Sequence, residues 1–414
     1  MSTSEHVVII NRWAEHYAQF TRYLDHQAHR VTYVSTEVGL SAVPTEATEV
    51  VTVRATDDLA EVTSAVDGLA RRHGAPDRIV ALKEDDLLVG AALRDRWAVP
   101  GPRVDDLLPF RDKFLMATRV AKAGVPLPEF ELISDEQAVH EFAGRVGWPV
   151  IVKPTIGSSS AGVVRIDGPH GVFPIEEPQL AQAFNPHQIY HVDGVFTGER
   201  LLVMRASRYL NNCLDFRSGG MLGSVEESDP AINEIIAEFA LRVMCALSDL
   251  ALVFHLEMFF DAEAGNCAFL EVGARVGGAE IPLLWREVHG HDLMKTAFRI
   301  QLGLGVGEET PHLTPEIGGW LLAPAPAHRP CRITETTPMV GRDPGPYAEV
   351  LLKVGEILPD ADSYYEHVGG RFRFRGPSTQ AVETAVRAIA AEFRVSGQPV
   401  AQAKKADQTE TELG

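Results

Sequence analysis

Short apolar runs alternate with amphipathic stretches along the first quarter of the chain. The short runs predict buried strands at residues 6–11, 30–34, 50–53 and 78–82. Apolar residues three and four positions apart predict helices at residues 13–27, 59–73 and 87–97. Strands that alternate with helices form a parallel sheet with crossover helices. No Gly-x-Gly-x-x-Gly follows the first strand, so dinucleotide binding is not supported.

Two apolar runs further along, residues 254–260 and 267–272, flank a short segment that contains Gly and Asn. This pattern predicts an antiparallel hairpin. Each run carries one carboxylate, Glu257 or Glu271, and a lone buried carboxylate is costly unless it is paired or binds a metal. Two carboxylates on adjacent strands favour a hard divalent cation. For the hairpin alone, structural roles for both glutamates and for Arg275 are the simpler interpretation.

A loop of small residues favours a ligand-binding role for this region over a purely structural one. A predicted strand at residues 150–152 ends at Lys153, and the loop at residues 157–162 follows. Backbone N–H groups and hydroxyls in such a loop can bind one anion, to which a lysine adds charge. The Gly-Lys-Ser/Thr end of a P-loop is absent, and a Gly/Ser loop alone is more often a flexible linker. Next to the strand and the lysine, and upstream of the carboxylate hairpin, phosphate binding is favoured.

These motifs together resemble the ATP-grasp superfamily, and most closely its carboxylate–amine ligases. The resemblance rests on Lys153-Pro before the loop, on Glu257, and on the Leu-Glu-Val-Gly-Ala-Arg run at residues 270–275. It covers residues 109–307 and implies an ATP-dependent ligase. Such an enzyme phosphorylates the carboxylate of an amino acid and lets an amine or amino acid displace the phosphate, and specialised (natural-product) biosynthesis is a setting for this chemistry.

The resemblance also implies a role for individual residues. Mg²⁺, or Mn²⁺ in its place, is expected at Glu257 and Glu271, and Arg275 is expected to stabilise the charge of the acyl phosphate. The ATP-binding residues that it implies are Lys113, Lys153, Ser158, Ser159, Ser160, Gln182, Phe184, Gln188 and Leu270. Without the resemblance, the simpler interpretation of Lys113 is a solvated lysine at the start of a helix.

The chain departs from the family pattern at three positions. Gln182 and Gln188 stand where family members usually carry glutamate, although glutamine still accepts hydrogen bonds from ribose. Gly273 stands where they usually carry an asparagine that binds metal. Two alternatives therefore stay open. One is a carboxylase-type or purine-pathway enzyme of the same fold, and the other is a catalytically degenerate ATP-binding protein.

Composition and net charge disfavour some classes of binding partner. The chain has 414 residues, of which 45% are hydrophobic, and this is enough for two to four domains. Its net charge of −19 disfavours nucleic acid as a partner. No apolar run approaches the length of a membrane span, and no signal pattern opens the chain, so we expect a cytoplasmic protein without a membrane partner. The expected partners are amino-acid and amine substrates and a second copy in a homodimer.

The predicted architecture combines α/β and α+β parts. Proline-rich composition from residue 311 onward breaks long elements and leaves short strands and one helix at residues 379–393, while residues 211–228 predict a loop. The expected domains are a Rossmann-like N-terminal domain at residues 1–108, an ATP-grasp core at 109–310 with a smaller lid at about 117–194, a C-terminal α+β subdomain at 311–395 and a disordered tail at 396–414.

Overall fold

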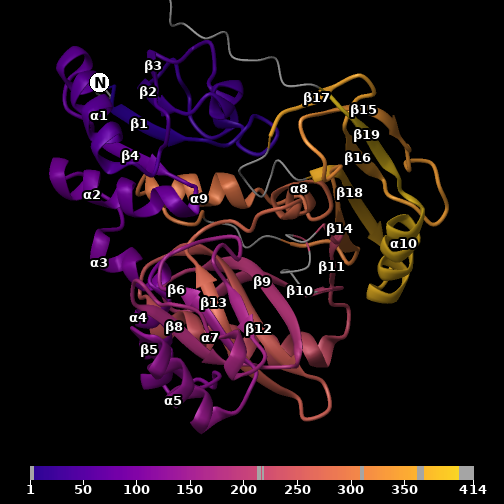
Figure 1. The fold of residues 1–414 in the computed structure, drawn as a ribbon. Coiled ribbons are helices and arrows are strands. Elements are labelled where there is room, and N and C mark those ends of the chain that lie inside the picture. The colour runs from indigo at the N-terminus through magenta and orange to yellow at the C-terminus, as the bar shows by residue number, and fades with distance from the viewer. Residues whose placement is uncertain (1–3, 212–215, 217–218, 308–311, 361–367, 401–414) are drawn as a thin grey trace, which may run out of the picture.

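The computed structural model describes residues 4–211, 216, 219–307, 312–360 and 368–400. Three parts surround two central helices, α8 (Ile281–Glu287) and α9 (Leu293–Gln301). Figure 1 shows the N-terminal strands at the upper left, the lid and the first strands of the large sheet below, and the C-terminal elements, which include the last strands of that sheet, at the right.

The N-terminal part is a parallel sheet with strand order β3-β2-β1-β4, as the sequence predicts. Its strands are β1 (His6–Asn11), β2 (Arg30–Ser35), β3 (Glu49–Thr52) and β4 (Arg78–Ala81). The helices of this part are α1 (Leu59–His73), α2 (Leu87–Trp97) and the short α3 (Val104–Leu107). The strand order reverses between β1 and β4, and ligands of open α/β sheets bind at the carboxyl ends of strands beside such a switch point.

The helix predicted at residues 13–27 is wrong. Only a 3-10 turn forms there, at Phe20–Arg22. The aromatic residues that suggested a helical face, including Trp13, Tyr17 and Phe20, are all buried in one core cluster. The Asn11 side chain fixes the start of the segment, because its Oδ1 accepts from Trp13 N at 2.9 Å. Tertiary packing therefore overrides the helical spacing.

The lid is a small antiparallel sheet with strand order β5-β8-β6-β7. Its strands are β5 (Phe130–Ile133), β6 (Val150–Pro154), β7 (Val164–Ile166) and β8 (Gln179–Ala183). Helix α5 (Glu136–Val146) packs on it through Val139 and Phe142. Helix α4 (Lys113–Lys122) leads into this part and begins at Asp112, whose side chain caps two backbone N–H groups.

An eight-stranded sheet forms the centre of the molecule, in the order β13-β12-β9-β10-β11-β14-β18-β16. Its strands are β9 (Gln188–Phe196), β10 (Leu201–Tyr209), β11 (Leu222–Glu226), β12 (Leu252–Asp261), β13 (Asn266–Gly273), β14 (Ile317–Pro324), β16 (Ala348–Leu351) and β18 (Val368–Gly376). Helices α7 (Pro230–Leu247) and α10 (Thr379–Glu392) cover its apolar face. The opposite face carries buried polar side chains such as His191 and Asp193 together with apolar ones, including Val253 and Trp320, that pack in one cluster with α8 and α9.

The C-terminal strands belong to two sheets. Strands β14, β16 and β18 extend the large sheet, because the open edge of β11 pairs with β14. A separate three-stranded sheet contains β15 (Cys331–Thr336), β17 (Ile357–Leu358) and β19 (Val395–Pro399). Strand β19 lies within the tail predicted to be disordered, and residues 401–414 lie outside the described residues. Strand β11 likewise lies within the predicted loop at 211–228.

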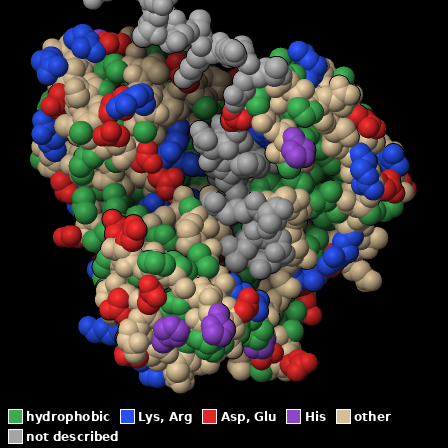
Figure 2. Space-filling view, in the orientation of Figure 1, with side chains coloured by type: hydrophobic (Ala, Val, Ile, Leu, Met, Phe, Trp, Pro, Cys, Tyr) green, Lys and Arg blue, Asp and Glu red, His purple; other side chains and the backbone are tan. Residues whose placement is uncertain are grey.

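Surface charge is mixed on the face shown in Figure 2. Lysine and arginine side chains of the described residues are scattered there among acidic ones and do not form a continuous stripe. Within the described residues, every helix is too short or too polar to cross a bilayer.

Candidate active site

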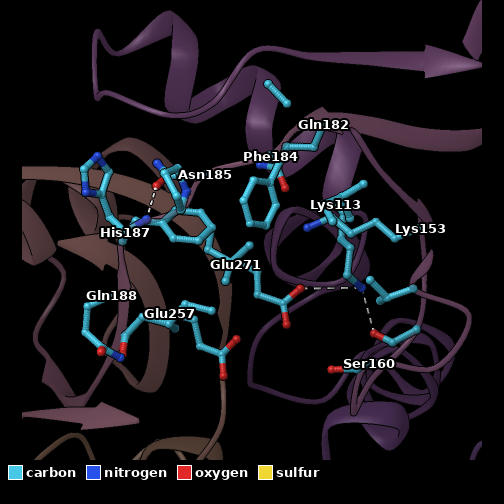
Figure 3. A pocket seen from close by; sticks show the side chains of 18 of the residues that line it. Lys113, Lys153, Ser160, Gln182, Phe184, Asn185, His187, Gln188, Glu257 and Glu271 are labelled. Carbon is cyan, nitrogen blue, oxygen red and sulfur yellow. Dashed lines mark hydrogen bonds and ion pairs between the residues drawn. The ribbon is translucent and has the colours of Figure 1, made fainter. Parts of the chain in front are cut away.

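The predicted hairpin forms between β12 and β13, and Glu257 lies directly opposite Glu271. An irregularity next to Glu257 shifts the pairing by one residue and leaves Leu270 without a partner across the ladder. A shift of one residue moves side chains to the other face of a sheet. The irregularity therefore brings both carboxylates to one face, where Figure 3 shows them pointing into the same space.

Two lysines face these carboxylates from the lid side. Lys113, in the first turn of α4, donates from Nζ to the Gly157 carbonyl at 2.9 Å and lies 3.9 Å from Oε2 of Glu271. Lys153, on β6, is only 3% exposed. Burial and the charge of Lys113 lower the pKa of Lys153, although Glu271 and Glu257 oppose this shift. Two lysines and two carboxylates thus line one cavity.

The Gly/Ser loop closes this cavity at one end. Ser158 and Ser160 line it, whereas Ser159 is exposed and does not. Ser159 and Ser160 both have left-handed backbone conformations, with φ of +53° and +55°, which residues other than Gly, Asn and Asp rarely adopt. Strained backbone of this kind clusters at ligand sites. The loop is therefore shaped for close approach of a ligand.

The cavity has a volume of about 390 Å³ and runs between the lid and the large sheet. The predicted residues Gln182, Phe184, Gln188 and Leu270 all line it. The guanidinium of Arg165 lies 4.4 Å from the centre of the Phe184 ring. Gln188 donates to the Tyr209 carbonyl at 2.8 Å, which holds its amide at the base of β9. Sequence reasoning missed further lining residues: Ile151, Asn185, His187, Leu210, Asn211 and Phe259.

Glu257 is held from behind by two side chains that the sequence analysis did not single out. Tyr209 donates its hydroxyl to Oε1 of Glu257 at 2.8 Å, and Nε2 of His255 lies 3.6 Å from the same oxygen. Burial opposes ionisation of Glu257, but these two partners lower its pKa. The carboxylate is therefore kept charged and oriented. His255 lies two positions before Glu257, on the same face of β12, and that spacing is the signal that could have found it.

A buried His–Asp–His group continues this network. Asp193 accepts from Nδ1 of His191 at 2.7 Å and from Nδ1 of His255 at 2.8 Å. Although burial opposes protonation, the charge of Asp193 raises the pKa of His255 to about 9. The ligand-type atoms of the three residues lie within 4.8 Å of one another. Because their facing atoms already hydrogen-bond to one another, the group supports Glu257 through this network.

Arg275 lies outside the main cavity. Its Nε donates to Oε2 of Glu84 at 2.7 Å, and its Nη1 donates to the Val276 carbonyl at 3.1 Å. It borders a much smaller cavity of about 20 Å³ that Lys113, Glu271 and Gly273 also line. Arg275 therefore adjoins the carboxylate side of the site without reaching the space between the lid and the sheet.

The donor set fits the groups that the sequence predicts. Paired carboxylate oxygens are the ligands that Mg²⁺ prefers, and it commonly joins one or two carboxylates to the phosphates of a substrate. Glu257 and Glu271 offer such oxygens next to the lysines and the serine loop. The apolar and amide side chains at the other end of the cavity suit a flat heterocycle.

Comparison with known proteins agrees with this geometry. No protein-family model matches the chain. Over 247 residues it is 24% identical to the L-arginine-specific L-amino acid ligase of Bacillus subtilis, and the match covers 55% of this chain and 58% of that protein, less than two thirds of its length. The structure resembles that of an L-amino acid ligase from Bacillus licheniformis, with a TM-score of 0.73 and 16% identity over 96% of this chain and all of that one.

The chain has the ATP-grasp fold. Two further ATP-grasp structures, solved with an ATP ligand, extend the comparison. Biotin carboxylase from Campylobacter jejuni has a TM-score of 0.65 and 14% identity, over 95% of this chain and 92% of that one. Carboxyaminoimidazole ribonucleotide synthase from Aspergillus clavatus has a TM-score of 0.67 and 13% identity, over 94% of this chain and 99% of that one. At these identities the ATP-grasp likeness establishes the fold and leaves the substrate open.

Proposed function

We propose that this protein is an ATP-dependent carboxylate–amine ligase that joins an amino acid to an amine or a second amino acid. The observation that carries the proposal is the pair of facing glutamates, Glu257 and Glu271, across one cavity from Lys113 and Lys153. The partial sequence match to an L-amino acid ligase supports this class over others of the same fold.

In this proposal the γ-phosphoryl group of ATP passes to a carboxylate oxygen, and ADP leaves. The amine nitrogen then attacks the acyl carbon, loses a proton, and phosphate departs. Lys113, Lys153 and the hydroxyls of the loop would bind the phosphates, and Glu257 and Glu271 would hold Mg²⁺, which would neutralise phosphate charge. Arg275 balances the negative charge that develops on the acyl phosphate. The lid keeps water from this reactive intermediate.

Two rival functions remain testable. A carboxylase-type enzyme would phosphorylate bicarbonate, and the structural likeness to biotin carboxylase motivates this alternative. A degenerate ATP-binding protein is motivated by Gly273 and by the glutamines at 182 and 188. The sequence match to an L-amino acid ligase favours the ligase over the carboxylase class, whereas only turnover separates an active ligase from a degenerate relative.

The deciding experiment is a screen of phosphate release from ATP and Mg²⁺. L-Arginine is tested first with each other amino acid, then all remaining pairs, and then bicarbonate with the same amines, with product masses recorded. Release that needs two amino acids and yields their dipeptide mass supports the proposal. Release with bicarbonate favours the carboxylase class. ATP binding without release under any condition favours the degenerate protein.

A further inference from the structure

One acidic segment of the N-terminal part contacts residues beside β13 and α4 and a serine of the Gly/Ser loop. The segment is the 3-10 turn Glu84–Asp86, which directly follows β4 at the switch point of the parallel sheet. Glu84 contacts Arg275, just after β13, and Arg111, just before α4. Asp85 contacts Arg111 and, from Oδ2 at 3.4 Å, the hydroxyl of Ser158 in the Gly/Ser loop.

Glu84 is the member of this segment that touches Arg275, and its side chain is only 15% exposed. Its Oε2 accepts from Nε of Arg275 at 2.7 Å, and its Oε1 forms an ion pair with Nη1 of Arg111 at 2.8 Å. One carboxylate thus joins the end of the hairpin to the start of the helix that bears Lys113. The two contacts use different oxygens, so both guanidinium groups are held at once.

The surroundings leave Arg275 little freedom around this contact. A β-carbon placed on Gly273 would lie 3.3 Å from Cγ of Arg275 and 3.6 Å from Oε1 of Glu84. Because Gly273 has no side chain, the side chains of Glu84 and Arg275 can occupy the space next to it. Glu84 and Arg275 also line the small cavity that Lys113 and Glu271 line.

We propose that Glu84 is a positioning residue that holds the Arg275 guanidinium beside the Lys113–Glu271 cavity, so that the N-terminal part of the chain sets the orientation of the catalytic arginine. This inference rests on the proposed ligase function for the role of Arg275. A buried ion pair contributes little net stability, since desolvation offsets its attraction. Orientation of a charge within the site is the role that this geometry supports.

The first test replaces Glu84 by glutamine, which keeps the size and removes the charge. The matched control is Glu49→Gln, because Glu49 forms an ion pair with Arg72 within the same part of the chain, away from the site. Loss of an outer-shell partner typically costs about 10–100-fold in activity. We expect Glu84→Gln to lower kcat of amino-acid-dependent phosphate release by about that factor, with the KM for ATP and the melting temperature close to those of the control. An unchanged kcat would overturn the proposal. A fall in kcat together with a higher KM for ATP and a lower melting temperature than those of the control would also overturn it, because general damage to the fold would then explain the loss.

A second test asks whether Glu84 acts through Arg275. Glu84→Gln is combined with Arg275→Lys, and the four proteins form a double-mutant cycle. If the effect of Glu84 passes through Arg275, Glu84→Gln changes kcat less than about twofold when Arg275→Lys is already present, because groups that act as a unit are not additive. Equal fold losses with and without Arg275→Lys would show that Glu84 acts elsewhere.

A readout that needs no substrate pair separates this proposal from the ligase assignment. Aluminium fluoride with Mg·ADP mimics a phosphoryl group in transfer, and a positioned Arg275 should tighten its binding. We expect aluminium fluoride to tighten Mg·ADP binding to the wild type and to Glu49→Gln, and to tighten it much less in Glu84→Gln. If the substrate screen fails but this difference is found, the ligase assignment falls and the role of Glu84 stands. If the three proteins respond alike, the role of Glu84 is overturned.

Discussion

Glu257 and Glu271 illustrate how one irregular residue pair decides the chemistry of this site. Both carboxylates reach the cavity because the pairing of β12 with β13 shifts by one residue beside Glu257. They are supported unequally: Glu257 has Tyr209 and His255 behind it, whereas Glu271 is more exposed and lies nearest Lys113. Glu271 is therefore the carboxylate whose removal should disturb function most and folding least.

We predict that Glu271→Gln folds normally and loses at least about 100-fold in kcat, because the metal loses a charged ligand at the phosphoryl group. Phosphate release at saturating Mg²⁺ measures this effect. Glu263→Gln, in the exposed turn of the same hairpin, is the control and should behave as the wild type. A kcat near that of the control would remove Glu271 from the metal site.

Lys153 calls for a more careful substitution than its place beside the Gly/Ser loop suggests. The side chain is buried, so alanine would leave a cavity in addition to removing the charge. Lys153→Met keeps most of the length and removes only the ammonium group. We predict a rise of roughly tenfold or more in the KM for ATP, from the loss of one charge-assisted phosphate contact, and a melting temperature equal to or above that of the wild type. Unchanged ATP kinetics would refute a role for this lysine in phosphate binding.

A substitution at Gly273 can show whether this departure from the family pattern removes a metal ligand or provides space for the neighbouring Arg275 side chain. An asparagine there would bring an oxygen toward the proposed metal site, but its β-carbon would lie 3.3 Å from Cγ of Arg275, a tight contact that requires the arginine to shift. We predict that Gly273→Asn folds, lowers kcat by about tenfold through a displaced Arg275, and leaves the Mg²⁺ requirement unchanged. Titration of Mg²⁺ on both proteins gives the answer. A lower Mg²⁺ concentration at half-maximal rate would instead identify Gly273 as the place of a missing ligand.

At the scale of elements, local patterns predicted most of what the structure contains. Strand β1 and helices α1 and α2 have the predicted bounds because their apolar periodicity and their burial coincide. The hairpin of β12 and β13 also forms as predicted, and it presents both glutamates on one face. The bulge that aligns them was missed because the pattern predicts two regular strands; unbroken alternation would place Glu271 on the face of Cys267 and Phe269, which is buried under α7.

The features that the sequence did not predict depend on contacts with other parts of the fold. Strand β11 has only five residues, and its strand character comes from pairing with β10 and β14 on both sides. The contact of Glu84 with Arg275 joins positions 191 residues apart, and no local pattern encodes such a distance. Strand β11 and the Glu84–Arg275 contact could not be predicted from local sequence patterns, because both depend on residues that are distant in the sequence.

The His–Asp–His group on β9 and β12 makes stability depend on pH in a defined direction. The folded-state pKa of His255, about 9, lies above its ordinary value of 6.5, so the folded state binds this proton more tightly. The stabilisation is fully present below about pH 6.5 and is lost as pH rises through about 9. We predict that the wild type loses roughly 2–3 kcal/mol more unfolding free energy over this range than His255→Gln does.

Denaturant unfolding of both proteins at several pH values measures that difference. Other groups titrate in the same range, so the comparison between the two proteins carries the result. Parallel losses in wild type and variant would mean that His255 is not held protonated in the folded state.

On the scale of the whole molecule, the large sheet depends on residues far along the chain. Strand β14 pairs with β11 on one side and β18 on the other, and Gly318 N donates to the buried Glu226 on β11 at 2.7 Å. We predict that a chain ending at residue 310 is insoluble or binds ATP at least about tenfold more weakly, because it leaves the edge of β11 open. Soluble expression and nucleotide titration test this. A soluble fragment with full ATP affinity would show that the core is complete without β14.

The same strand order has a consequence for how the chain is made. The strands of the parallel sheet and of the lid all lie within residues 6–183, so each of these sheets can close soon after it leaves the ribosome. The large sheet cannot, because β14 and β18 are synthesised late: β14 pairs with β11, which by then has long emerged, and β18 pairs with β14. At about 5–20 residues per second, the edge of β11 waits for several seconds with unpaired backbone groups. The newborn protein therefore passes through a stage in which its central sheet is half built, and that stage is where chaperones would have most to protect.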